Sequence, residues 1–409
     1  MCRETRPPWL FAPFPAISCP TMLGGPFLFA YFCPCLKLFH MKRLFIVWLC
    51  AALKFGCLCG CVGCLCACSW NNGGGDAPVV ALDKAGEEAV GFEDVFRVVE
   101  TVPLELNDEC ILSYIIKVEA WKGNFYVLDG QLKSVCVFDR DGRFVRRIGT
   151  AGPGHGEYAS ATDFTLDEEQ GRVAILSGPM RVYCYDLQGN FISSKDISPY
   201  WSWKIAGSPG GFVGLTQYQT YTEGEHAFLF YTFDRDFNAT GEWVDVRKEY
   251  CLPMPRSFLQ KSAGRVYGFD DRRNAIFEWD GRADSMRQVC TFRFAHPMPA
   301  GVEGQEEYMN AMFRYDVMLG GAVAGGKAVL FYLHEGRQHA ALFGLDGTLS
   351  AAGPYEEVPP ALFGGEGDEV LLYLDAGRYA EFAESHPGLV PRMPADGEVN
   401  AVVLRCRLR

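Results

Sequence analysis

The feature that most constrains the fold is an approximate repeat of short strands in the C-terminal three quarters of the chain. In its clearest copy, Gly123 precedes an apolar segment that ends at Asp129, and further segments follow at 134–139 and 144–149. Apolar residues alternate within these segments, and an Asp141-Gly142 turn separates the last two. Alternation at a period of two with an Asp-Gly turn predicts antiparallel β-hairpins.

The spacing of the copies predicts the architecture. Six leading glycines are separated by 48, 40, 53, 62 and 41 residues, namely Gly123, Gly171, Gly211, Gly264, Gly326 and Gly367. Units of about 40–50 residues with four strands are typical of the blades of a β-propeller. We therefore predict an all-β fold over residues 91–409, a six-bladed β-propeller with four-stranded blades. The alternative is an array of two-sheet sandwiches.

One predicted strand lies outside the repeats. Residues 95–99 alternate like a strand but have no blade of their own, while 399–404 form the last strand of the chain. We expect the first to complete the last blade and so close the ring, which removes exposed sheet edges. Residues 302–319 are the only segment for which the pattern predicts a long helix.

The N-terminal segment has a different composition. Eleven of the 17 cysteines lie in the first 68 residues. Residues 1–40 contain seven prolines, which disfavour a transmembrane helix. Met41-Lys42-Arg43 and the apolar run 44–53 then have the layout of an export signal. We expect translation to start at Met41, with 1–40 an over-extended gene call or an unstructured leader.

The cysteine-rich segment ends in a pattern that resembles a bacterial lipobox. Residues 65–68 read Leu-Cys-Ala-Cys, and Cys68 is the expected site of lipidation, although Cys61 and Cys64 fit almost as well. Under this interpretation 41–68 form the lipoprotein signal, and residues 69–90, which begin with a polar, glycine-rich run, form a flexible tether. The lipid would attach the protein to a membrane.

Two other interpretations of this segment remain open. The close spacing of the cysteines between Cys57 and Cys68 is compatible with a metal cluster, but no histidine lies nearby. An uncleaved membrane helix over 44–68 would place Lys54 in the apolar core of the bilayer, which is costly.

The charge of the body excludes one class of partner. Residues 76–409 carry 32 basic and 49 acidic side chains, a net charge of −17. Proteins that bind nucleic acid neutralise phosphates with clustered lysine and arginine. We therefore expect no nucleic-acid partner.

A connector between the first two copies resembles a known family. Residues 148–158 read I-G-T-A-G-P-G-H-G-E-Y, similar to the G-x-x-G-x-G-P-G-E-[FY] connector of NHL-type propellers, with His155 where proline is usual. With the preceding strands, the chain resembles six-bladed NHL/TolB-like propeller lipoproteins of Bacteroidetes; the motif-level match covers 120–192. The resemblance implies an exported, lipid-anchored protein of the periplasm or outer membrane, in a family largely without assigned activity.

The candidate metal ligands are acidic residues at matching positions of the repeat. Asp129, Asp270 and Asp375 each end the first recognised strand of a copy, where the second copy has Ser177. If they converge near the ring axis, they would hold Ca²⁺ or another hard cation. The resemblance adds that some lactonase-type six-bladed propellers use such a metal. The alternative is that each aspartate accepts hydrogen bonds from amides of the following turn.

The candidate ligand-binding residues are aromatic. Trp201, Trp203, Tyr218 and Tyr221 cluster between the second and third copies. Aromatic side chains on loops can stack on sugars or capture peptide side chains. Packing in the core is the alternative explanation.

The sequence assigns no catalytic residue. It lacks a G-x-S-x-G motif, and residues 334–339 (H-E-G-R-Q-H) are one residue too long for the zinc-protease motif H-E-x-x-H. Gly336 indicates a hairpin turn there. Cys136 and Cys184 occupy matching strand positions, so we expect buried core residues; disulfide pairing stays open.

These observations favour a binding module over an enzyme. We expect an exported, lipid-anchored propeller that binds a glycan, a peptide or an envelope protein, without a cofactor other than a possible Ca²⁺ ion. The alternative is a Ca²⁺-dependent, lactonase-like hydrolase that uses the acids near the axis. A structural subunit of an envelope assembly is a third interpretation.

Overall fold

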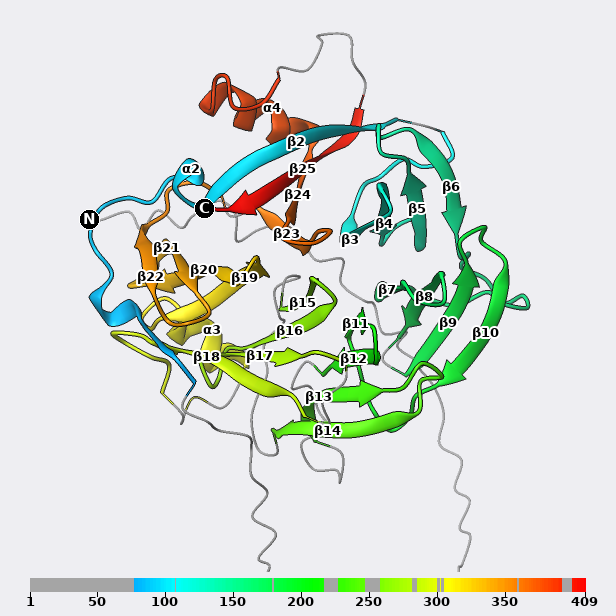
Figure 1. The fold of residues 1–409 in the computed structure, drawn as a ribbon, viewed down its shortest axis with the longest axis horizontal. Coiled ribbons are helices and arrows are strands. Elements are labelled where there is room, and N and C mark those ends of the chain that lie inside the picture. Colours follow the sequence, from blue (N-terminus) through cyan, green and yellow to red (C-terminus); the bar gives the residue numbers. More distant parts are fainter. Residues whose placement is uncertain are drawn as a thin grey trace, which may run out of the picture. The chain divides into compact units, whose positions relative to one another are not determined.

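The computed structural model describes residues 77–409, apart from 107, 179, 217–226, 247–257, 282–284, 300–301, 303–304, 359 and 392–398. The described strands form six sheets arranged around a common axis, and each contains four antiparallel strands (Figure 1). The predicted six-bladed β-propeller is therefore confirmed, and the sandwich array is wrong. Cys68 and the predicted signal segments lie outside the described residues.

The first three blades follow one another in the chain, each with its first strand nearest the axis. Blade one is β3 (Ile115–Trp121), β4 (Asn124–Asp129), β5 (Ser134–Phe138) and β6 (Phe144–Ile148). Blade two is β7 (Asp163–Asp167), β8 (Arg172–Ser177), β9 (Arg181–Asp186) and β10 (Phe191–Asp196). Blade three is β11 (Lys204–Ser208), β12 (Gly211–Leu215), β13 (Phe228–Phe233) and β14 (Ala239–Asp245).

Blades four to six complete the ring. Blade four is β15 (Leu259–Ser262), β16 (Arg265–Asp270), β17 (Ala275–Trp279) and β18 (Arg287–Arg293). Blade five is β19 (Val317–Ala324), β20 (Lys327–His334), β21 (Arg337–Gly344) and β22 (Leu349–Pro354). Blade six is β23 (Ala361–Gly364), β24 (Val370–Asp375), β25 (Val399–Leu408) and β2 (Phe96–Glu105).

Five of the leading glycines lie in the turn between the first two strands of their blade, and Gly211 is the first residue of β12. All six have φ between 60° and 147°, a region that residues with a Cβ rarely adopt. The need for this backbone conformation explains why a glycine begins every copy.

The ring is closed by the N-terminal strand, as predicted. β2 pairs antiparallel with β25, and Val102 and Leu104 lie opposite Val403 and Ala401. The sixth blade thus combines the two ends of the body, and its outer edge is supplied by a strand that precedes blade one.

The hydrophobic core lies between adjacent blades. Leu128 and Val135 of blade one pack in one cluster with Phe164 and Val173 of blade two. Every residue of β5, the third strand of blade one, is buried, whereas β10, the outermost strand of blade two, is mostly exposed. The sequence reflects this gradient, with apolar inner strands and polar outer ones.

Three elements differ from the sequence-based expectations. Helix α3 spans only Gln305–Ala311, and β19 begins at Val317 inside the predicted helix 302–319, because Gly320 and Gly321 disfavour helix and the chain alternates there. Helix α4 (Ala376–Ser385) was not expected. Strand β1 (Val79–Ala81) lies within the predicted tether 69–90 and pairs parallel with β18.

Two short helical turns, η2 (Leu82–Lys84) and α2 (Phe92–Val95), connect β1 to β2. A disulfide joins Cys110, just after β2, to Cys136 of β5. Cys184 is a buried free cysteine, as expected, whereas Cys136 is paired. Within the described part of the chain, no helix has the length and apolar character needed to cross a membrane.

Candidate functional site

Antiparallel pairing distributes the turns of each blade between two faces of the ring. We call the face that carries the six leading-glycine turns the hairpin face. The opposite face carries the C-terminal ends of β4, β8, β12, β16, β20 and β24 and the described connections between blades, and we call it the crossover face. The candidate site lies on the hairpin face.

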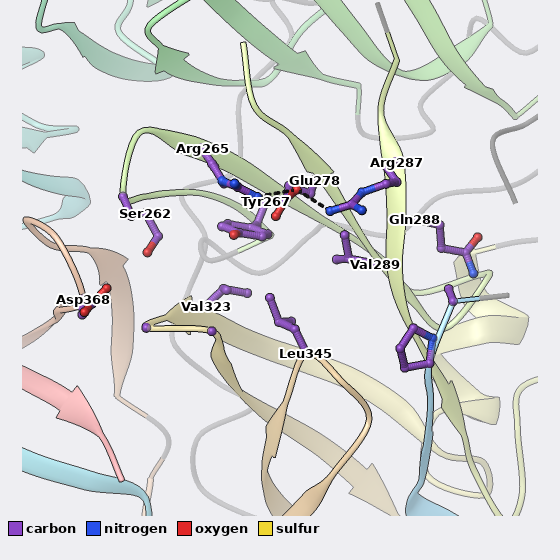
Figure 2. A pocket seen from close by; sticks show the side chains of 15 residues that line it. Ser262, Arg265, Tyr267, Glu278, Arg287, Gln288, Val289, Val323, Leu345 and Asp368 are labelled. Atoms are coloured by element: carbon purple, nitrogen blue, oxygen red, sulfur yellow. Dashed lines mark hydrogen bonds and ion pairs between the residues drawn. The ribbon is translucent and has the colours of Figure 1, made fainter. Parts of the chain in front are cut away.

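A pocket of about 740 Å³ opens between blades four and five. Arg265, Tyr267, Glu278 and Arg287 of blade four form one wall, and Val323 and Leu345 of blade five lie opposite them (Figure 2). Asp368, in the turn between β23 and β24, reaches the same opening from blade six. Gly325 and Gly326 add no side chains, which keeps the opening wide.

Two arginines share one carboxylate in this wall. The Glu278 Oε1 atom accepts hydrogen bonds from Arg265 Nη1 at 2.8 Å and from Arg287 Nη2 at 2.9 Å. The three residues come from β16, β17 and β18, whose antiparallel register places Glu278 opposite Arg287. The buried Glu278 carboxylate thus fixes both guanidinium groups. The Arg265 and Arg287 side chains are 47% and 64% exposed, and each has further N–H donors for a ligand.

The protonation states in the wall are set by this pairing. Burial raises the pKa of Glu278, but hydrogen bonds from Arg265 and Arg287 outweigh it and hold that pKa below its ordinary value. Burial and the nearby Glu278 carboxylate raise the pKa of Tyr267. Glu278 is therefore charged and Tyr267 neutral at physiological pH, so the wall offers both hydrogen-bond donors and acceptors.

A network of charged side chains lies on the innermost strands, near the centre of the ring. Lys117 Nζ lies 3.1 Å from Glu119 Oε1 and 3.5 Å from Asp163 Oδ2, and it donates hydrogen bonds to the carbonyls of Phe164 and Ile205. Lys261 Nζ lies 3.7 Å from the other carboxylate oxygen of Glu119, Oε2. The acids on the innermost strands thus meet lysines across the axis.

The innermost strands β15 and β23 also pack closely against each other. A Cβ atom on Gly364 would lie 1.8 Å from the Lys261 carbonyl oxygen, so only glycine permits the approach of the two strands. The cavity left between these strands and β3 measures about 20 Å³, room for about one water molecule. The three innermost strands therefore leave little free space where they meet.

The three predicted metal ligands lie in separate blades, each bound to its own turn. Asp129 accepts hydrogen bonds from the amides of Ser113, Tyr114, Gln131 and Leu132. Asp270 accepts them from the amides of Arg272 and Arg273, and Asp375 caps helix α4 through the Arg378 amide. Ser177 is the last residue of β8, the matching position in blade two.

The structure does not bring these aspartates together as ligands. Among the described residues, the group of three metal-ligating side chains within 4.8 Å of one another is His296, His334 and Glu335. The carboxylates of Asp129 and Asp270 serve as turn acceptors, the alternative that the sequence left open. A Ca²⁺ ion at Asp129, Asp270 and Asp375 remains an untested prediction.

Only part of the predicted aromatic platform lies within the described residues. Trp201 and Trp203 are both half-buried in the connection between blades two and three. The Trp201 carbonyl accepts a hydrogen bond from Thr216 Oγ1, and the Trp203 amide donates to the Leu215 carbonyl. Tyr218 and Tyr221 lie outside the described residues. The platform therefore stays a prediction.

The connector 148–158 is folded by its own side chains. The buried Tyr158 donates a hydrogen bond to the Lys133 carbonyl, and Glu157 accepts one from the Gly154 amide. A Cβ on Gly149 would lie 2.4 Å from the Tyr158 hydroxyl. These contacts explain its glycines as packing requirements of the crossing between blades.

The pocket residues were not predicted from the sequence. Arg265, Glu278 and Arg287 belong to no motif, and only the register of three strands brings them together. The one available signal was their position, since each lies near the hairpin-face end of its strand.

Comparisons with known structures agree with the fold. A candidate exported protein from Bacteroides fragilis superimposes with a TM-score of 0.65 at 16% identity, over 81% of this chain and 99% of that chain. A member of the DUF4221 family from Bacteroides vulgatus gives a TM-score of 0.45 at 8% identity, over 77% and 99% of the two chains. At 16% identity, the similarity to the Bacteroides fragilis protein shows the fold alone.

Sequence comparison identifies the family. No curated protein matches this chain in sequence. The model of the family described as "Domain of unknown function (DUF4934)" matches residues 77–345, more than half of the chain and most of the propeller. The chain therefore belongs to the DUF4934 family.

Proposed function

We propose that this propeller is a binding module whose hairpin-face pocket takes a neutral, hydroxyl-rich ligand, a glycan fragment. The observation that carries the proposal is the wall in which Glu278 fixes Arg265 and Arg287. The pocket volume of about 740 Å³ falls in the range typical of small-molecule sites, about 300–1,000 Å³.

The charges of the pocket favour a neutral ligand over an ionic one. Two arginines are balanced by Glu278 and Asp368, so the lining has no net charge. Sugar hydroxyls both donate and accept hydrogen bonds, and they match a wall that offers guanidinium donors beside carboxylate and tyrosine acceptors. Val289, Val323 and Leu345 provide apolar contacts for the faces of a sugar ring.

The proposal is tested by screening the full chain on a glycan array and titrating the best ligand by calorimetry. Glu278→Gln removes the charge that orients both arginines, and we expect it to weaken binding at least tenfold, or about 1.4 kcal/mol. Asp196→Asn, which breaks the exposed Arg181 ion pair in blade two, is the control and should bind normally. Equal affinity in Glu278→Gln and the wild type would contradict the assignment.

We also infer that the protein is exported and lipid-anchored at Cys68. The lipobox-like sequence at 65–68 supports this inference, as does the fold shared with a candidate exported Bacteroides protein. Metabolic labelling with a palmitate analogue in a Bacteroides host should mark the wild type and leave Cys68→Ala unlabelled, with Cys66→Ala as control. Retained label in Cys68→Ala would place the lipid on another cysteine.

A further inference from the structure

On the crossover face, blade five carries a cluster of metal-ligating side chains remote from the pocket. An imidazole nitrogen from each of His296 and His334 and a carboxylate oxygen of Glu335 all lie within 4.8 Å of one another. His296 belongs to the connection after β18, whereas His334 ends β20 and Glu335 begins the following turn. Residues 38 positions apart in the sequence therefore meet in one exposed group.

A buried carboxylate holds the two histidines in place. Asp316 Oδ1 lies 2.8 Å from His334 Nδ1, and Asp316 Oδ2 accepts a 2.8 Å hydrogen bond from the His296 amide. The Asp316 amide in turn donates to the His296 carbonyl at 2.7 Å. The Asp316 side chain is 1% exposed, so both histidine-bearing segments are fixed to one rigid acceptor.

This contact selects the nitrogen that His334 presents. With Nδ1 bound to Asp316, the Nε2 atom is the ring nitrogen left for a ligand. Histidines that bind metals commonly pair their other nitrogen with a carboxylate, which fixes the ring and strengthens the ligand. The His296 ring lies nearly parallel to that of His334, at 5.8 Å between centroids and an angle of 15°.

The turn fixes the third ligand. His334 and Arg337 are paired across β20 and β21, so Glu335 and Gly336 form a two-residue hairpin loop. Both have positive φ, 49° and 75°, as the tightest hairpin turns require. Glu335 is thereby held directly beside the His334 ring and is exposed to solvent.

We propose that His296, His334 and Glu335 bind a Zn²⁺-class divalent ion, with Asp316 as the positioning residue. Two imidazoles and one carboxylate form a donor set that suits borderline transition metals rather than Ca²⁺, which prefers oxygen ligands. Three protein ligands leave a coordination position for water, as in open zinc sites. The exposure of His296 and Glu335 lets the ion enter from solvent.

The test uses the full chain. Because cysteine thiolates are also zinc ligands in general, the readout must be specific to the site. Zn²⁺ should protect His296 and His334 from diethylpyrocarbonate, measured by mass spectrometry. The exposed His155, distant in blade two's connector, should react equally with and without Zn²⁺. Ca²⁺ at the same concentration should protect neither histidine.

Variants at exposed positions complete the test. His296→Ala and Glu335→Gln should each bind Zn²⁺ at this site at least tenfold more weakly, as measured by loss of His334 protection. His155→Ala is the matched control and should behave as the wild type. Melting temperatures in EDTA should agree among all four proteins, since the substituted side chains lie at the surface. Unprotected histidines in the wild type, or unchanged protection in both variants, would overturn the proposal.

Discussion

Lys117 is the residue whose surroundings depend most on charge pairing. Burial lowers its pKa, but Asp163 and Glu119 outweigh this and raise the pKa above its ordinary value. Burial raises the pKa of Glu119, but Lys117, Lys261 and the Leu166 amide outweigh that effect and lower it. The two groups therefore stay charged inside the ring and stabilise each other.

Replacing one partner tests this pairing. Lys117→Met keeps an unbranched side chain but removes the ammonium group that Glu119 and Asp163 share, and we expect it to lower the free energy of unfolding by about 3–5 kcal/mol. Urea denaturation at neutral pH measures the change. The exposed Lys195→Met should change stability by less than about 0.5 kcal/mol. A loss of similar size in both variants would contradict the assigned role.

The same pairing predicts how stability depends on pH. Because the folded pKa of Glu119 lies below its unfolded value, its contribution is present above the ordinary glutamate pKa of 4.5 and is lost as the pH falls through the folded value. The contribution of Lys117, whose pKa is raised, is present at neutral pH and disappears only above its ordinary 10.5. In Lys117→Met, the free energy of unfolding should therefore depend less on pH, both in the acidic and in the alkaline range.

At the scale of elements, β2 determines whether the ring closes. Leu104 is fully buried in β2, whereas Val99 on the same strand is 45% exposed. Leu104→Ala should lower the free energy of unfolding by about 2–5 kcal/mol, because a cavity would remain where β2 meets β25 and blade one.

Val99→Ala is the matched control on the same strand and should change stability by less than about 0.5 kcal/mol. Urea denaturation of the two variants and the wild type measures both effects. Similar small losses in both variants would mean that β2 contributes little to closing the ring.

The elements also show which features the sequence can predict. Strands, leading glycines and the closing role of residues 95–99 follow from local alternation and turn chemistry, so they were predictable. Helix α4 and the parallel addition of β1 to β18 depend on tertiary packing. The Arg265–Glu278–Arg287 wall depends on strand register, which no motif encodes.

The histidine cluster on the crossover face could also be predicted only in part from the sequence. His334 ends the second strand of blade five, where other blades have Asp129, Asp270 and Asp375. Aligning the six copies would have marked this histidine as an exception. Its partner His296 lies in a connection outside the repeat, and only the fold brings it next to Asp316.

For the whole molecule, the two faces carry separate chemistry. The hairpin face has a charge-balanced pocket between blades four, five and six, and the crossover face has the histidine cluster of blade five. The two sites share no residue, and they lie at opposite ends of the strands. Loss of zinc binding should therefore leave glycan binding unchanged.

The most direct test of the central claim is hydrogen–deuterium exchange of the full chain with and without the glycan selected on the array. Binding in the pocket should slow exchange at 262–267 and 285–289, the segments that carry the pocket wall, and this protection should disappear in Glu278→Gln. Protection confined to 198–216, around Trp201 and Trp203, would contradict the account and place the ligand on the aromatic segment instead.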